Sequence, residues 1–184
     1  MKVYKIQSTI EAEGDIFSFG GDRNGRITDY FVSNKGDGKF LSFFKPKIVA
    51  QELIKEEEVS KADFLKGDLS IPIFSTKAAE ILSEKLSSEV NFYPARIFVG
   101  KKEFEFQLCK VNIYTDIIDE KKSEYMQLSD GTQIISKPIY RSNFDENFRI
   151  ARDKKYKSRY VVSSAFIEIC LSREIVIDFA ELDQ

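Results

Sequence analysis

Two stretches of this chain repeat the order strand, helix, strand, and this repeat constrains the fold more than any other feature. The first runs LSIPIF, STKAAEILSEKLSSE and VNFYP over residues 69–94, and the second runs RYVV, SSAFIEICLSR and EIVIDF over residues 159–179. When Ser75 is aligned with Ser163, Glu80 falls on Glu168. The first helix is about a turn longer. The chain therefore contains two similar strand-helix-strand units, which predict parallel strand pairs within a mixed sheet.

The first unit carries its own start signals. Ser75 or Thr76 is placed to cap the helix, because a hydroxyl there accepts a bond from an amide of the first turn. Pro72 lacks a backbone donor, which indicates an edge strand or the start of a strand. The spacing i, i+3, i+4 predicts a buried helix face made by four residues, Ala78, Ala79, Leu82 and Leu86.

The remaining segments read mostly as strands. Residues Lys2–Ile10 alternate as one strand, and Arg96–Val99 with Glu103–Leu108 form a hairpin around Gly100. A glycine-rich loop covers residues 20–25. The apolar segments Ile27–Ser33 and Phe40–Phe44 are separated by turn residues, as in a hairpin or a wider loop.

Pro46 predicts the start of a helix with the sequence KIVAQELIKEEE, since proline is favoured in a first turn. Its last residues, Glu56–Glu58, would then oppose the helix dipole at the C-terminal end. Few helices among alternating strands favour an α+β fold with a mixed, largely antiparallel sheet. We expect one domain over 1–184, with a division into an N-terminal lobe 1–60 and a C-terminal lobe 61–184 as the alternative.

Composition excludes several kinds of chemistry. The chain has no histidine, which rules out histidine-based triads and histidine zinc sites. The net charge of −2 gives no overall attraction to nucleic acid or to anionic membranes, and no apolar run approaches the ~18 residues of a membrane span. Cys109 and Cys170 lie in apolar contexts and are interpreted as buried free thiols in a reducing compartment. We expect a cytoplasmic protein without metal, cofactor or catalytic residues.

Two acidic groups are candidates for binding a partner. The first contains Glu52, Glu56, Glu57, Glu58 and Asp63, and a solvated helix face is the plainer interpretation of such a charge run. The second contains Asp116, Asp119 and Glu120. Aspartates at the end of a strand are usually turn formers. A carboxylate-dependent hydrolase would require one of them to face another acid in a pocket.

A basic stretch supports an alternative function. Residues 141–160 contain seven arginines and lysines interleaved with aromatic residues, a pattern that can hold a phosphate backbone and stack bases. Asp145, Glu146 and Asp153 dilute the positive charge. A solvated loop or an acidic protein partner therefore explains the stretch better than nucleic acid does, and a nucleic-acid-associated accessory protein is the alternative prediction.

Residues 62–179 resemble a family of small bacterial immunity proteins, called immunity protein 11 and formerly a domain of unknown function. The resemblance is carried by ADFLKGDLSIPIFSTKAAEILSEKL, VNFYPARI, LCKVNIYTDIIDEKKSEY and RYVVSSAFIEICLSREIVIDF. Asn112, Asp116, Asp119 and Ser123 approximate the family's polar stretch, whereas Thr76 and Ser164 stand where the family has glutamate. The resemblance implies a binding protein without a cofactor, whose partner is a cognate toxin of a polymorphic toxin system.

Overall fold

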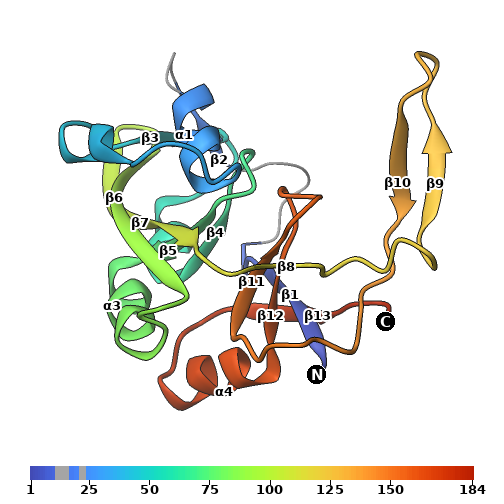
Figure 1. The fold of residues 1–184 in the computed structure, drawn as a ribbon. Coiled ribbons are helices and arrows are strands. Elements are labelled where there is room, and N and C mark those ends of the chain that lie inside the picture. Colours follow the sequence, from blue (N-terminus) through green and yellow to red (C-terminus); the bar gives the residue numbers. More distant parts are fainter. Residues whose placement is uncertain (11–16, 21–23) are drawn as a thin grey trace.

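The computed structural model describes residues 1–10, 17–20 and 24–184, and these form an α+β fold with two mixed, largely antiparallel sheets (Figure 1). One sheet has six strands in the order β2 (Phe17–Phe19), β3 (Lys47–Ala50), β6 (Val90–Val99), β7 (Lys102–Val111), β5 (Pro72–Ser75) and β4 (Phe64–Lys66). The other has five, in the order β13 (Asp178–Glu181), β1 (Val3–Gln7), β12 (Tyr160–Ser163), β11 (Ile150–Asp153) and β8 (Tyr114–Thr115).

The helices are short, and a separate hairpin completes the fold. The helices described are α1 (Asn24–Phe31), α2 (Glu56–Lys61), α3 (Thr76–Lys85) and α4 (Ser164–Ser172), with a 3₁₀ turn η1 (Lys39–Ser42). Strands β9 (Glu124–Gln127) and β10 (Gln133–Lys137) pair only with each other. In Figure 1 this hairpin stands away from both sheets.

Both predicted strand-helix-strand units are confirmed. The first is β5-α3-β6. Strand β5 begins at Pro72, a position where the missing backbone donor of proline is tolerated. Ser75 is the N-cap of α3, and its hydroxyl accepts a hydrogen bond of 3.1 Å from the amide of Ala78. The four residues of the predicted helix face, Ala78, Ala79, Leu82 and Leu86, are all buried. The predicted hairpin is the pair β6–β7, which extends to ten residues on each strand.

The second unit is β12-α4-β13, and it matches the first strand by strand. Its two strands flank β1 in the middle, just as β5 and β6 flank β7. Because each middle strand is antiparallel to both neighbours, the outer strands of each unit run parallel without touching. The parallel relation was predicted; the inserted middle strand was not. A hairpin partner precedes each unit, namely β4 for the first and β11 for the second.

The two units are joined by a shared apolar core and by reciprocal polar contacts. The core contains Phe74 and Leu82 from the first unit and Phe166 and Cys170 from the second. The carboxylate of Asp63, just before β4, accepts a bond of 2.8 Å from the amide of Val176, in the segment after α4.

The reverse contact comes from Glu89, in the segment after α3. Its carboxylate accepts bonds of 2.7 and 3.0 Å from the amides of Arg149 and Ile150, at the start of β11, and 2.9 Å from the Arg149 guanidinium. In each unit, the segment that follows the helix thus binds the start of the strand that precedes the other unit, namely β4 or β11.

The helix predicted from Pro46 is wrong. Residues 47–50 form β3, which pairs in parallel with β6 through Ile48 and Ile97. Ile48 is completely buried whereas Lys47 and Val49 are exposed, the alternation of a strand with one face on the core and one face in solvent. The neighbouring strands β2 and β6 offer β3 hydrogen bonds and burial that outweigh its weak helical pattern. Helix α2 begins only at Glu56, so the three glutamates occupy the first turn, where they favour the helix dipole.

The hairpin considered for residues 27–44 is also not formed. Ile27–Phe31 belong to α1, and Lys39–Ser42 form η1. The helix buries Ile27, Tyr30 and Phe31 against the six-stranded sheet. These residues are three and four positions apart, as on one helix face, but a helix of eight residues is too short for this period to stand out in the sequence. The predicted loop over 20–25 includes residues 21–23, outside the described part, and Asn24 and Gly25 are helical.

A separate N-terminal lobe over 1–60 is not what the strand pairing shows. Strand β1 is the middle strand of the second unit, whereas β2 and β3 extend the other sheet beside β6. Residues of this segment therefore contribute to both sheets. The first strand ends at Gln7, three residues before the predicted Ile10.

Candidate functional site

The first acidic group lies around the start of α2, and its three helix residues, Glu56–Glu58, are engaged with neighbouring groups. Glu56 pairs with Lys102 at 3.4 Å, Glu57 pairs with Lys61 one turn along the helix, and Glu58 accepts a bond of 2.9 Å from the amide of Lys55. These side chains are exposed. Exposed ion pairs contribute little stability, so the glutamates remain accessible to a partner.

Glu52 and Asp63 differ sharply from these helix residues. Glu52 is exposed and has no ion pair within the described ranges. Asp63 is only 6% exposed, accepts bonds from the Ser75 hydroxyl and the Val176 amide, and lies 3.7 Å from Lys77. Its assignment to a partner-binding surface is therefore wrong: its carboxylate connects the two units. The sequence offered no signal for this, because the amide of Val176 is 113 residues away.

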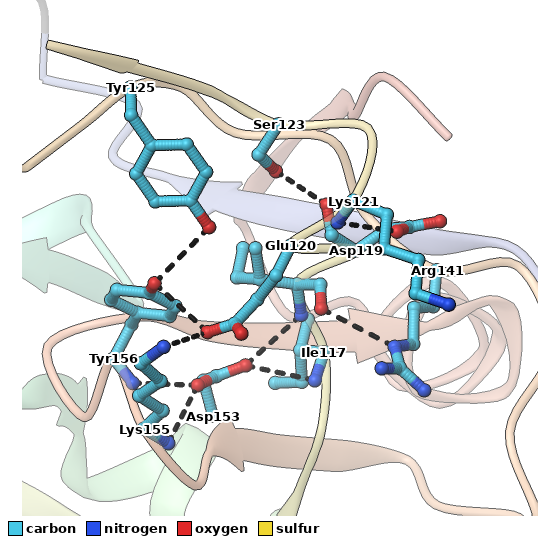
Figure 2. A network of polar contacts seen from close by, with 11 residues as sticks. Ile117, Asp119, Glu120, Lys121, Ser123, Tyr125, Arg141, Asp153, Lys155 and Tyr156 are labelled. Carbon is cyan, nitrogen blue, oxygen red and sulfur yellow. Dashed lines mark hydrogen bonds and ion pairs between the residues drawn. The ribbon is translucent and has the colours of Figure 1, made fainter.

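The second acidic group meets the basic stretch, which the sequence had treated as a separate candidate (Figure 2). Glu120 pairs with Lys155 and accepts a bond of 3.0 Å from the Tyr156 hydroxyl. Asp116 lies 3.9 Å from Lys154. The two groups of opposite charge therefore lie against each other, and the side chains of Asp116 and Glu120 stay exposed.

Asp119 serves a turn in the same network. Its carboxylate accepts a bond of 3.1 Å from the amide of Lys121, and its backbone oxygen accepts a bond of 2.8 Å from the Ser123 hydroxyl. This is the turn-forming role that the sequence favoured. Asp119 and Glu120 border an open depression of about 440 Å³, but each carboxylate is directed at a cation, a hydroxyl or a backbone amide instead of another acid. The geometry for a carboxylate-dependent hydrolase is not formed by these residues.

Asp153 organises this region, and sequence reasoning missed it. Its side chain is 2% exposed and accepts four backbone bonds: 2.9 and 3.0 Å from Ile117 and Ile118, and 2.8 and 2.6 Å from Lys155 and Tyr156. The bonds to Lys155 and Tyr156 are local, as in an Asx turn, and belong to a recognisable sequence pattern. Figure 2 shows how the same carboxylate also positions the segment that leads to Glu120.

The rest of the basic stretch is dispersed. Arg149 pairs with Glu89, Arg152 is completely buried, and Lys157 donates a bond of 3.0 Å to the backbone oxygen of Ser33. Arg141 donates to the backbone oxygen of Ile118 at 3.3 Å. Arg152 is thus held inside the fold, whereas Arg141 and Arg149 stay exposed and contact separate segments.

The network reaches the β9–β10 hairpin through a pair of tyrosines. The hydroxyls of Tyr125 and Tyr156 lie 3.4 Å apart. This hydrogen bond, with partial burial and the bond to Glu120, raises the pKa of Tyr156 to about 12. Tyr125 is opposite Ile135, whose side chain contacts a third apolar cluster of the body. One face of the hairpin is thereby tied to the molecule.

The other face of the hairpin is apolar and uncovered. Met126 is directly opposite Ile134, and because side chains alternate along a strand, both point away from the face of Tyr125 and Ile135. Their exposed fractions are 49% and 40%. Leu128, two residues beyond Met126, is 41% exposed. We call Met126, Leu128 and Ile134 the hairpin face. Sequence alone did not indicate this exposure, because it follows from a hairpin whose strands pair only with each other, outside both sheets.

Comparison with known proteins leaves the function open: no family model matches the chain, and no curated protein matches it. In the described ranges, no three acidic or cysteine side chains are grouped so as to hold a metal ion. No helix there is long and apolar enough to cross a membrane.

Proposed function

We propose that this protein is an immunity-type binding protein that neutralises a cognate bacterial toxin by covering its active site or an essential surface. The proposal begins from the resemblance of residues 62–179 to the immunity family. The observation that carries it is the hairpin face, three exposed apolar side chains on a projecting two-stranded ribbon. A ribbon of two strands is marginally stable alone, and burial against a partner would stabilise it.

The toxin surface that fits the hairpin face is apolar at its centre. Met126 and Ile134 supply adjacent apolar anchors, of the kind that contribute most to binding when fully desolvated. Glu52, Glu56, Glu57 and Glu58 form a second candidate contact, which would steer a basic toxin and raise its association rate. The two surfaces predict different kinetic effects, so they can be tested separately.

The test is calorimetric binding to the C-terminal toxin domain encoded immediately upstream, together with an assay of toxin activity. We expect tight binding and loss of toxin activity. Replacing Met126 and Ile134 together by threonine keeps the strand preference and should weaken binding by ~100-fold or more, chiefly through faster dissociation. Gln133→Thr, on the opposite face of the same hairpin, is the matched control and should leave affinity unchanged.

Charge reversal tests the acidic contact. Glu56–Glu58 changed to lysine should slow association and reduce its dependence on salt if these residues face the toxin. Unchanged kinetics would remove them from the interface. Absence of any binding by the unaltered protein would overturn the proposal, and binding that the threonine variant retains in full would remove the hairpin face from it.

A further inference from the structure

A cavity of about 310 Å³ is lined by residues of β1 and β12, of the segment after β4, and of the chain on either side of these strands. Its wall combines Lys5 of β1, Lys66 at the end of β4 and Arg159 just before β12. Tyr140 and Tyr160 also line it. The cavity is therefore built from segments that only the folded chain brings together, and it is distinct from the hairpin face and from the acidic groups.

Among the described residues that line this wall, positive charge exceeds negative charge even when Lys66 is left out of the count. Lys5 and Arg159 are opposed there by one carboxylate, that of Asp68, which already accepts a bond of 3.2 Å from the amide of Phe19. Within the described ranges, the side chain of Lys5 has no ion pair, and the Arg159 guanidinium donates only to the Tyr140 hydroxyl, at 3.4 Å. This local excess stands out in a chain whose net charge is −2.

A buried cation lies behind the same wall. Arg152 is completely buried, and its guanidinium donates to the backbone oxygens of Ser70, at 3.1 Å, and of Lys157. Its carbon Cζ lies 5.3 Å from the ring centre of Tyr160. Ser70 and Tyr160 both line the cavity.

No described carboxylate pairs with Arg152, and its Nε has no hydrogen-bond partner. Buried charges are normally paired. An anion in the cavity would add negative charge on the side of Ser70 and Tyr160, both of which contact Arg152.

We propose that this cavity binds a small phosphate-bearing molecule of about the size of a nucleoside monophosphate. The volume lies at the lower end of the range for small-molecule sites. Lys5 and Arg159 would hold the phosphate, because guanidinium and ammonium groups form strong charge-assisted bonds to its oxygens. The rings of Tyr140 and Tyr160 would contact the flat, less polar part of the molecule. This site is independent of toxin binding.

The test uses calorimetry with three probes: adenosine 5′-monophosphate, adenosine and inorganic phosphate. We expect saturable binding of the monophosphate, weaker binding of phosphate, and no detectable binding of adenosine. The double variant Lys5→Gln/Arg159→Gln should bind the monophosphate at least ~10-fold more weakly, a loss typical of removing charged hydrogen bonds. The single variant Lys5→Gln alters only an exposed side chain and should also bind more weakly.

Lys35→Gln/Arg173→Gln is the matched control, because it removes the same charge from exposed positions outside the cavity. It should bind the monophosphate as the unaltered protein does. The proposal is overturned if the unaltered protein binds neither the monophosphate nor phosphate. It is equally overturned if adenosine binds as tightly as the monophosphate, or if the Lys5 variant and the control lose affinity alike.

Discussion

The two strand-helix-strand units share one architecture but obtain their middle strands differently. In the first unit, β7 follows β6 directly through the tight turn at Gly100, which adopts a positive φ of 57°. In the second, the middle strand is β1, from the opposite end of the chain. The strand registers of the two units still agree at equivalent positions. Phe92 of β6 lies opposite Cys109 of β7, and Phe179 of β13 lies opposite Ile6 of β1. The strand arrangement is thus independent of how the chain connects it.

The polar contacts of the two units differ more than their strands. In the first, Ser75 accepts a bond from the amide of Ala78 and donates to Asp63. In the second, Ser163 occupies the same position, yet its buried hydroxyl has no partner. The residue before the first hairpin is Asp63 and the one before the second is Arg149. Equivalent positions therefore keep their apolar roles, while their polar roles are specific to each unit.

The largest expected effect comes from removing β1. Deleting residues 1–8 would leave β12 and β13 without the strand between them, and would expose the contacts of Val3 and Ile6 in two clusters. We expect loss of cooperative folding, measured by circular dichroism and urea unfolding. Deleting only Met1 and Lys2, which are both exposed, is the control and should be tolerated.

A circular permutant tests whether the second unit still folds when its middle strand β1 follows β13 directly in the chain. Strands β13 and β1 are antiparallel neighbours, and the Gln184 side chain donates a bond of 3.1 Å to the backbone oxygen of Val3. A short glycine-serine linker from Gln184 to Met1, with new ends between Ser129 and Asp130, would make β13–β1 a hairpin like β6–β7. We expect this permutant to fold cooperatively; an unfolded product would show that the sequence order of β1 matters.

The reciprocal contacts come next in size. Glu89→Ala should lower the free energy of unfolding by ~3 kcal/mol, because it leaves the buried amide of Ile150, the part-buried amide of Arg149 and the Arg149 guanidinium without their acceptor. Asp63→Ala should cost ~2 kcal/mol for the same reason at Val176 and Ser75. Urea unfolding measures both. Glu80→Ala, at an exposed position of α3, is the control, and equal losses in all three variants would contradict the assignment.

The helix caps give a smaller and more selective effect. Ser75→Ala should cost ~1 kcal/mol, because the amide of Ala78 loses its acceptor. Ser163→Ala should change stability by less than ~0.5 kcal/mol, since the hydroxyl that it removes is buried without a partner. Thermal or urea unfolding of the two variants side by side decides the matter. A loss at Ser163 as large as that at Ser75 would refute the difference between the units.

The last effect is a pH dependence, and it concerns two thiols in the core that the units share. Burial raises the pKa of Cys109, and it raises the pKa of Cys170 to about 12. The unfolded chain ionises each thiol near its ordinary value, whereas the folded chain keeps it protonated. Stability is therefore fully present below that value and falls as the pH rises above it, by ~1 kcal/mol per thiol at about pH 9.

Urea unfolding at about pH 7 and about pH 9 measures this loss, and the variant Cys109→Ala/Cys170→Ala should lose part of the pH dependence. A thiol reagent should react with neither cysteine until the protein unfolds, since the free thiols are buried. Reaction in the native state at the rate seen in denaturant would contradict the assignment.

Local patterns in the sequence predicted both strand-helix-strand units, the Ser75 cap, the β6–β7 hairpin and the α+β class. They could do so because hydrophobic periodicity and helix capping depend on residues only a few positions apart. Only the tertiary structure decided β3, where the neighbouring strands β2 and β6 outweighed a weak helical pattern, and the middle strand β1, paired with residues more than 150 positions away.

The candidate residues show the same division. The turn at Asp119 and the exposure of Glu56–Glu58 follow from local chemistry. The burial of Asp63 and Glu89, and the pairing of Asp116 and Glu120 with lysines of the basic stretch, depend on segments distant in sequence. Charge and residue type are properties of the sequence, but which charges meet, and which remain free for a partner, depends on how distant strands are brought together.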